Sequence, residues 1–200
     1  MQPEQPVTPM PDPNTELPSG PHATTLAGWA FQGRIITIGL VTGCVVMGSI
    51  FWMISDQPAP PAEADPQGDD TTEIIFVAIG AVALVINCVM AFLVPHIIRS
   101  AGALRLKTAD NAAASVRLWS DWPERETLPL PLIRFCQTDQ TARLIGQALL
   151  EGTAIINFVM MFLTQSAVNL LCALVALVGV LAMFPTISGM RARIESALKE

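Results

Sequence analysis

Four long apolar runs dominate this chain and constrain its fold more than any other feature. They cover residues 35–54, 74–94, 144–163 and 167–184. Each of the first three holds about 20 residues, and a helix of that length crosses the roughly 30 Å hydrocarbon layer of a bilayer. The runs therefore predict four transmembrane helices.

The basic residues are distributed in a way that sets the orientation of these helices. All 11 Lys and Arg residues lie outside the runs, and none lies between the first and second runs or between the third and fourth. Short loops that retain Lys and Arg stay in the cytoplasm. The pattern predicts that both termini are cytoplasmic and that the loop 56–73 is outside.

The segments between the runs differ in composition. Residues 1–26 are rich in proline and poor in apolar side chains, so we expect a disordered cytoplasmic tail. The loop 56–73 carries six acids and no base, and the segment 96–143 carries seven bases and five acids. The latter fits the anionic cytoplasmic leaflet, but its positive balance is too dilute to indicate nucleic-acid binding.

The predicted fold is an all-α polytopic membrane protein with four transmembrane helices arranged as two hairpins. Its membrane domain covers 27–200, with Trp29 and Phe31 at the headgroup level. The prolines of the segment 128–131 should break any helix, so we expect Thr138 or Asp139 to cap the third helix. The second helix either ends at Pro95 or continues beyond a kink at this proline, and the sequence leaves both alternatives open. Residues 187–200 should form a short amphipathic basic tail.

Sequence features typical of enzymes and metal proteins are missing. The chain has two histidines, no Cys-x-x-Cys pair and no phosphate-binding loop. Its cysteines act as small apolar residues in the runs or lie on the cytoplasmic side: Cys44, Cys88, Cys136 and Cys172. We therefore expect no catalysis, no metal and no cofactor.

Gly39 and Gly43 stand four residues apart in the first run. Small residues at this spacing let two helix backbones approach closely inside a membrane. We assign these glycines to helix packing. The partner is either another helix of the same chain or a second copy of the protein.

Glu151 is the single acid inside an apolar run. A carboxyl at that depth costs on the order of 3 kcal/mol and needs a compensating environment. At helical spacing Gln147 lies one turn before it and Asn157 lies on the neighbouring arc, whereas Leu150, Ile155 and Met161 should point elsewhere. With Asn87 of the second run, we predict an intramembrane polar site: Glu151, Gln147, Asn157 and Asn87.

The role of this carboxyl has three interpretations. No base lies in any run, so an ion pair is excluded and a neutral acid is favoured. That acid can donate a hydrogen bond to Asn87, to Asn169 or to a backbone carbonyl and fix helix packing. It can instead carry a proton or bind a cation, or contact a lipid headgroup, a partner subunit or a water-filled cavity.

The stretch from Arg143 to Phe158, with Ala-Leu-Leu-Glu at 148–151, resembles the outer helix of rotor-ring proteolipids, the c subunits of ATP synthases. The resemblance covers one helix. It implies that Glu151 carries a proton.

A second resemblance spans residues 138–188. Gln-Thr-Ala-Arg at 140–143, Ala-Leu-Leu-Glu-Gly at 148–152 and Phe-Pro-Thr at 184–186 follow in order. This order is similar to a family of uncharacterised bacterial inner-membrane proteins of planctomycete type. It implies a four-span protein of the bacterial inner membrane and no particular activity.

Three functional hypotheses follow. The first is a non-enzymatic structural or interaction subunit of the inner membrane, whose partners are the lipid bilayer and either a second copy or another membrane subunit. The second is a proton- or ion-translocating component that uses Glu151. The third is a membrane assembly or accessory factor that meets its partner through 96–143.

Overall fold

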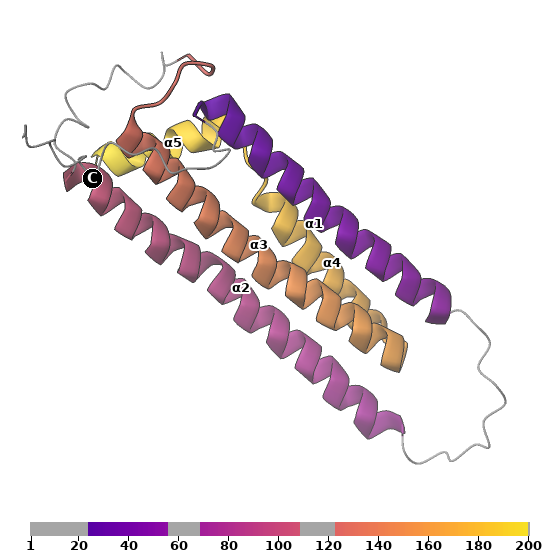
Figure 1. Cartoon of the computed structure of the whole chain (residues 1–200). Helices are drawn as coiled ribbons and strands as arrows, with labels where there is room; N and C mark the ends of the chain where they lie inside the picture. The colour runs from indigo at the N-terminus through magenta and orange to yellow at the C-terminus, as the bar shows by residue number, and fades with distance from the viewer. Residues whose placement is uncertain (1–23, 56–68, 109–122, 200) are drawn as a thin grey trace, which may run out of the picture.

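The computed structural model describes residues 24–55, 69–108 and 123–199 (Figure 1). These residues form five helices: α1 (Leu26–Ser55), α2 (Asp69–Thr108), α3 (Leu130–Thr164), α4 (Ala167–Ala182) and α5 (Ile187–Lys199). Pairing of β type in this part is confined to one isolated bridge between Thr25 and Thr127. The all-α prediction is confirmed. The predicted disorder of the tail and most of the acidic loop fall outside the described residues.

Helix α3 lies at the centre of the bundle. The helices α1 to α4 run alternately in opposite directions, with α1 and α2 on the two flanks of α3 (Figure 1). The share of the most apolar stretch that is buried inside the protein is 44% for α3, 17% for α1 and 11% for α2. Since α1 and α2 pack mainly on α3 and not on each other, the predicted layout of two hairpins is not confirmed.

Among the described residues, three helices are long and apolar enough to cross a membrane, namely α1, α2 and α3. A fourth span requires α4 and α5 to count together, although they are bent by 70° relative to each other. Large apolar side chains on the flanking helices face outward, including Met53 at 73% exposure and Ile74 at 68%. Water-soluble proteins rarely expose such contiguous apolar surface. The described fold therefore fits a multi-pass membrane protein.

The helices extend beyond the apolar runs at the end of the bundle that holds α5. Helix α3 begins at Leu130, with Pro129 at its N-cap and Pro131 in its first turn. Backbone N–H groups in the first turn of a helix have no acceptor within the helix, so a proline, which has no N–H, costs no hydrogen bond there. Its fixed φ also suits the helix. The prediction that these prolines exclude a helix was wrong. The capping role expected of Thr138 or Asp139 was also wrong, because both residues lie inside the helix.

Helix α2 continues past Pro95 to Thr108. Proline donates no hydrogen bond, so the carbonyl of Ala91, four residues earlier, loses its usual helical partner. Gly146 of α3 packs against this carbonyl: a Cβ added to Gly146 would lie 2.9 Å from the Ala91 oxygen. A glycine Cα–H can make a weak hydrogen bond to such an oxygen. Because Gly146 has no side chain, α3 can approach α2 closely at the point where Pro95 interrupts the hydrogen bonds of α2.

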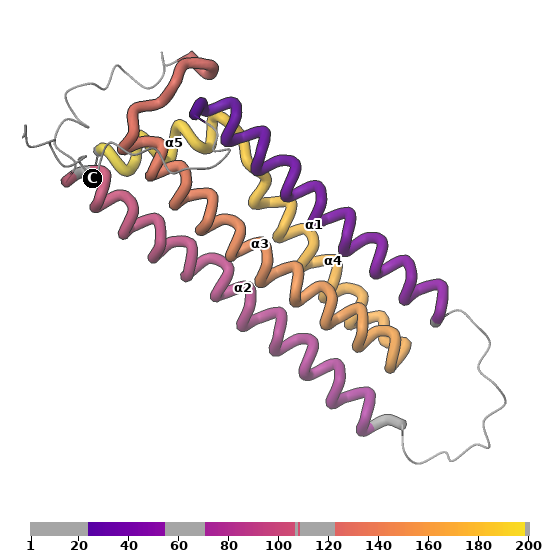
Figure 2. Tube along the Cα trace, in the orientation of Figure 1, coloured from indigo at the N-terminus to yellow at the C-terminus, as the bar shows by residue number. Residues whose placement is uncertain are grey.

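An apolar core lies where the ends of α1, α2 and α3 meet α5. Figure 2 traces α5 turning away from α4 into this position. Helix α5 contributes Met190, Ile194 and Ala197, one face at spacings of four and three residues, which confirms an amphipathic helix. Trp29 of α1 is also buried there, at 4% exposure, so its ring packs against protein, and its position at the headgroup level stays a prediction. Phe31, at 65% exposure, does face outward.

The two glycines assigned to helix packing face open space. A Cβ added to Gly39 or Gly43 meets no atom within 4 Å. Packing of these glycines against another described helix of the same chain is therefore contradicted, because the side of α1 that faces α3 carries Gly48 instead, against Phe158. Contact between Gly39 and Gly43 and a second copy remains a prediction.

Candidate functional site

Gln147 joins α3 to α1. Its side chain is 1% exposed, and its Nε2 donates a hydrogen bond of 2.8 Å to Oγ1 of Thr37. The Thr37 hydroxyl in turn donates to the carbonyl of Gly33 at 2.9 Å. The amide is thus satisfied by a helix–helix contact, as a buried polar group in a membrane requires.

Asn157 joins α3 to α2. It is fully buried, and its Nδ2 donates to the carbonyls of Gly80 at 3.3 Å and Thr153 at 3.0 Å. Asn169 of α4, also fully buried, donates from Nδ2 to Oγ1 of Thr164 at 3.4 Å.

The side-chain oxygens of both asparagines converge on Gly80. A Cβ added to Gly80 would collide with Oδ1 of Asn157 and would lie 2.6 Å from Oδ1 of Asn169. Neither oxygen has a hydrogen-bond partner within the described part of the chain. The glycine Cα therefore fills the space between two amide oxygens, where weak Cα–H···O contacts are the interaction open to them.

Glu151 follows Gln147 by four residues on α3, so it lies near the side of α3 that Gln147 turns toward α1. Its side chain is partly exposed, and no hydrogen bond or ion pair joins it to any residue in the described ranges. The expected bond to Asn87, to Asn169 or to a backbone carbonyl is absent there. The carboxyl is left facing the outside of the single chain.

The four residues of the predicted polar site do not meet. Gln147 contacts α1, Asn157 contacts α2, and Asn87 lies half-buried on α2 without a hydrogen bond to the described residues. The polar side chains of α3 diverge because this helix has neighbours on several sides. For the same reason Leu150 and Met161, expected to point away from the packed face, are buried at 1% and 5% exposure.

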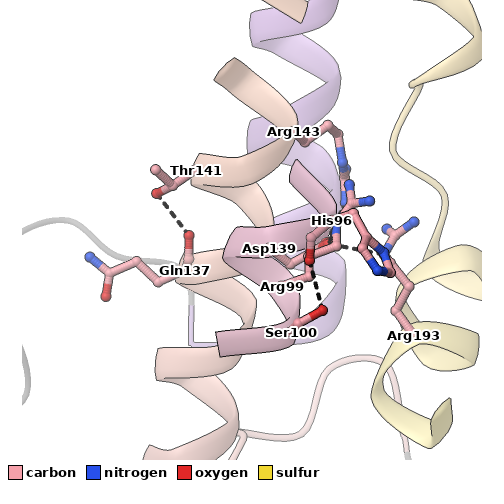
Figure 3. A network of polar contacts seen from close by, with 8 residues as sticks. All are labelled: His96, Arg99, Ser100, Gln137, Asp139, Thr141, Arg143 and Arg193. Carbon is pink, nitrogen blue, oxygen red and sulfur yellow. Dashed lines mark hydrogen bonds and ion pairs between the residues drawn. The ribbon is translucent and has the colours of Figure 1, made fainter. Parts of the chain in front are cut away.

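A cluster that the sequence did not predict surrounds Asp139, which is 3% exposed (Figure 3). Arg99 of α2 donates from Nε to its Oδ1 at 2.8 Å, and Arg143 donates from Nη2 to its Oδ2 at 2.7 Å. Arg193 of α5 places Nε 3.1 Å from Oδ1. We call these four residues the Asp139 cluster; it ties α2, α3 and α5 together.

One part of the Asp139 cluster was visible in the sequence. Asp139 and Arg143 are four residues apart, the spacing of an ion pair along one helix. The proline-rich segment before Asp139 suggested a helix start there, so the acid was assigned to a cap. Arg99 and Arg193 lie far away in the chain, and only the packing of α2 and α5 brings them to it.

Within 24–55, 69–108 and 123–199, no group of three or more His, Cys, Asp or Glu side chains could hold a metal ion. Gln147 and Asn157 join α3 to its neighbours, whereas Glu151 has no such contact in the described part of the chain.

In its described residues the protein is all-helical, with three or four helices able to cross a membrane. Comparisons with protein-family models, with curated proteins and with solved structures found no match to this chain.

Proposed function

We propose that this protein is a non-enzymatic structural or interaction subunit of the bacterial inner membrane. The observation that carries the proposal is the position of Glu151, which is partly exposed on α3 and lacks a hydrogen-bond partner in the described part of its own chain. A carboxyl at membrane depth needs such a partner. A polar group on a second copy or on another membrane subunit supplies it, and the outward-facing Gly39 and Gly43 offer a further close-approach surface.

Two substitutions of Glu151 test this role. Glu151→Gln keeps a hydrogen-bonding group, so the complex isolated from membranes in mild detergent should keep its size and composition. Glu151→Leu removes the group, and we expect the complex to weaken by about 1 kcal/mol, a several-fold shift toward the single chain. Complex size by light scattering and composition by mass spectrometry give the readout.

The matched control is Ile156→Leu, an apolar exchange on the exposed side of α3. It should leave the complex unchanged. A single chain without partners in the unaltered protein would contradict the interaction role.

The same unpaired carboxyl supports a second candidate function, the movement of protons or cations. If Glu151 carries a proton, Glu151→Gln should abolish the flux into proteoliposomes and leave the unfolding temperature unchanged, because the amide cannot be deprotonated. Dye-detected flux in the unaltered protein that is lost in this variant would replace the interaction role by translocation. Equal flux in protein-loaded and empty liposomes would exclude translocation.

We also propose that both termini are cytoplasmic. The described chain begins and ends at one end of the bundle, the end that holds Arg34, Arg99, Arg143 and Arg193 (Figure 1). Basic residues favour the cytoplasmic side. The acidic loop 56–73 would then lie outside.

Thiol labelling tests this orientation in a variant without native cysteines. A cysteine at Gln67 should react with an impermeant reagent in intact cells, whereas one at the exposed Ser196 should react only after the membrane is opened. The native Cys136 cannot serve as the inner probe, because it is 1% exposed. The reverse labelling pattern would place the termini outside.

A further inference from the structure

The Asp139 cluster holds more positive than negative charge. Its three arginines make every described ion pair with one carboxylate, that of Asp139. Three charges of +1 against one of −1 leave an excess of +2. Glu195 follows Arg193 on α5 by two residues. Residues two apart point to different sides of a helix, so we do not count Glu195 in the charge of the cluster.

The cluster also holds more donors than acceptors. A guanidinium carries five N–H donors, whereas one carboxylate offers about four acceptor positions. Arg99 uses Nε alone toward Asp139, and its two terminal nitrogens make no hydrogen bond to any described residue. The Nε of Arg193 is buried and within ion-pair distance of Asp139 but not aligned for a hydrogen bond with an acceptor in the described chain.

The two arginines with spare donors are also accessible. Arg99 is 33% exposed and Arg193 is 32% exposed, whereas Arg143 and Asp139 beneath them are 7% and 4% exposed. Arg99 and Arg193 both contact Oδ1 of Asp139, so their guanidinium groups lie close together, and their terminal N–H donors make no hydrogen bond to a described residue. Such a pair of forks suits an anion with several oxygens.

The cluster lies at the edge of the apolar surface. Arg99 follows the exposed apolar residues Phe92, Leu93 and Ile97 of α2 by less than two turns, and beyond it only Leu104 is a large exposed apolar side chain of the described part of α2. Arg34 of α1 packs on Phe184 nearby. Phosphates of lipid headgroups lie at this depth of a bilayer.

We propose that Arg99 and Arg193, held in place by Asp139 and Arg143, bind a phosphate-bearing anion at the membrane surface. Asp139 acts as a positioning residue: it orients the guanidinium groups and reduces their mutual repulsion. Their spare N–H donors bind the phosphate oxygens. The site is independent of Glu151, which lies three turns further along α3 toward the opposite end of the bundle.

The test compares Arg99→Gln with Arg105→Gln in the full-length protein. Both variants remove one charge from the same end of α2, but Arg105 is exposed and outside the cluster. Asp139 keeps two arginine partners in Arg99→Gln, so that variant should fold. Each protein is placed in nanodiscs of phosphatidylcholine alone or mixed in equal parts with phosphatidylglycerol, and phosphatidylglycerol binding is measured by native mass spectrometry.

We expect binding of phosphatidylglycerol to weaken at least about tenfold in Arg99→Gln and to stay within about twofold in Arg105→Gln. The unfolding temperature in mixed discs should rise above that in phosphatidylcholine for the unaltered protein and for Arg105→Gln only. If phosphatidylglycerol binding weakened equally in both variants, the effect would come from general surface charge, and the proposed binding site would be contradicted.

A second arm separates the two sources of the phosphate group. Inorganic phosphate is added to phosphatidylcholine discs and compared with chloride at equal ionic strength. If inorganic phosphate raises the unfolding temperature and this rise is lost in Arg99→Gln, the ligand is a free anion. If only phosphatidylglycerol raises it, the ligand is a lipid headgroup. No rise in either arm overturns the proposal.

Discussion

Asp139→Asn is expected to lower the free energy of unfolding by about 3–5 kcal/mol. The substitution removes the carboxylate that Arg99, Arg143 and Arg193 share and leaves three positive charges close together. Arg143 is 7% exposed, so its guanidinium cannot turn to water without disturbing the packing around α3. Chemical unfolding of the purified protein in detergent measures the change.

Two controls isolate the role of the cluster. Glu124→Gln removes an ion pair of 4.0 Å to Arg191 whose acid is 52% exposed, and it should change stability by less than about 1 kcal/mol. The double variant Asp139→Asn, Arg143→Met should recover part of the loss, because an apolar side chain replaces the stranded buried charge. Equal effects of Asp139→Asn and Glu124→Gln would show that the cluster contributes no more than a surface pair.

Gly80→Val is expected to lower the free energy of unfolding by about 1–3 kcal/mol, the usual cost of overpacking. The new Cβ would collide with the side-chain oxygens of Asn157 and Asn169. Asn157 cannot turn away freely, since its Nδ2 is bonded to the carbonyls of Gly80 and Thr153. The unfolding temperature in detergent gives the measurement.

Gly152→Val is the matched control for Gly80→Val. Gly152 is also in the interior of a helix of the bundle, but a Cβ there meets nothing within 4 Å. Both changes alter helix propensity equally, so the difference between them reports the contact with the two asparagines. Equal unfolding temperatures would mean that α2, α3 and α4 adjust at Gly80 without cost.

The candidate site shows where reasoning from the sequence reached its limit. Glu151 could be identified from the sequence because an acid inside an apolar run is costly however the helices pack. Its neighbours were placed on one arc of one helix, which is correct for Gln147 and Asn157 within α3. The error was to assume a single packed face, whereas α3 has α1, α2 and α4 around it and sends these two amides to different partners.

The Asp139 cluster shows the complementary limit. The prolines at 129 and 131 predicted a break, because proline usually ends a helix, yet proline is equally suited to a first turn. The sequence does not say which applies, since both uses satisfy the local backbone. Once α3 begins at Leu130, Asp139 becomes an interior residue that must be paired.

Local properties of the chain determined that it is helical and that three or four helices can cross a membrane, because hydrocarbon admits only backbone that satisfies its own hydrogen bonds. Only the tertiary structure decided that α3 is the centre, that Gly80 rather than Gly39 or Gly43 is the tight contact, and that Arg99 and Arg193 meet Asp139. These facts depend on which face of each helix turns toward which neighbour. Inside a membrane, where lipid and protein are equally apolar, that choice depends on close packing between residues distant in the sequence.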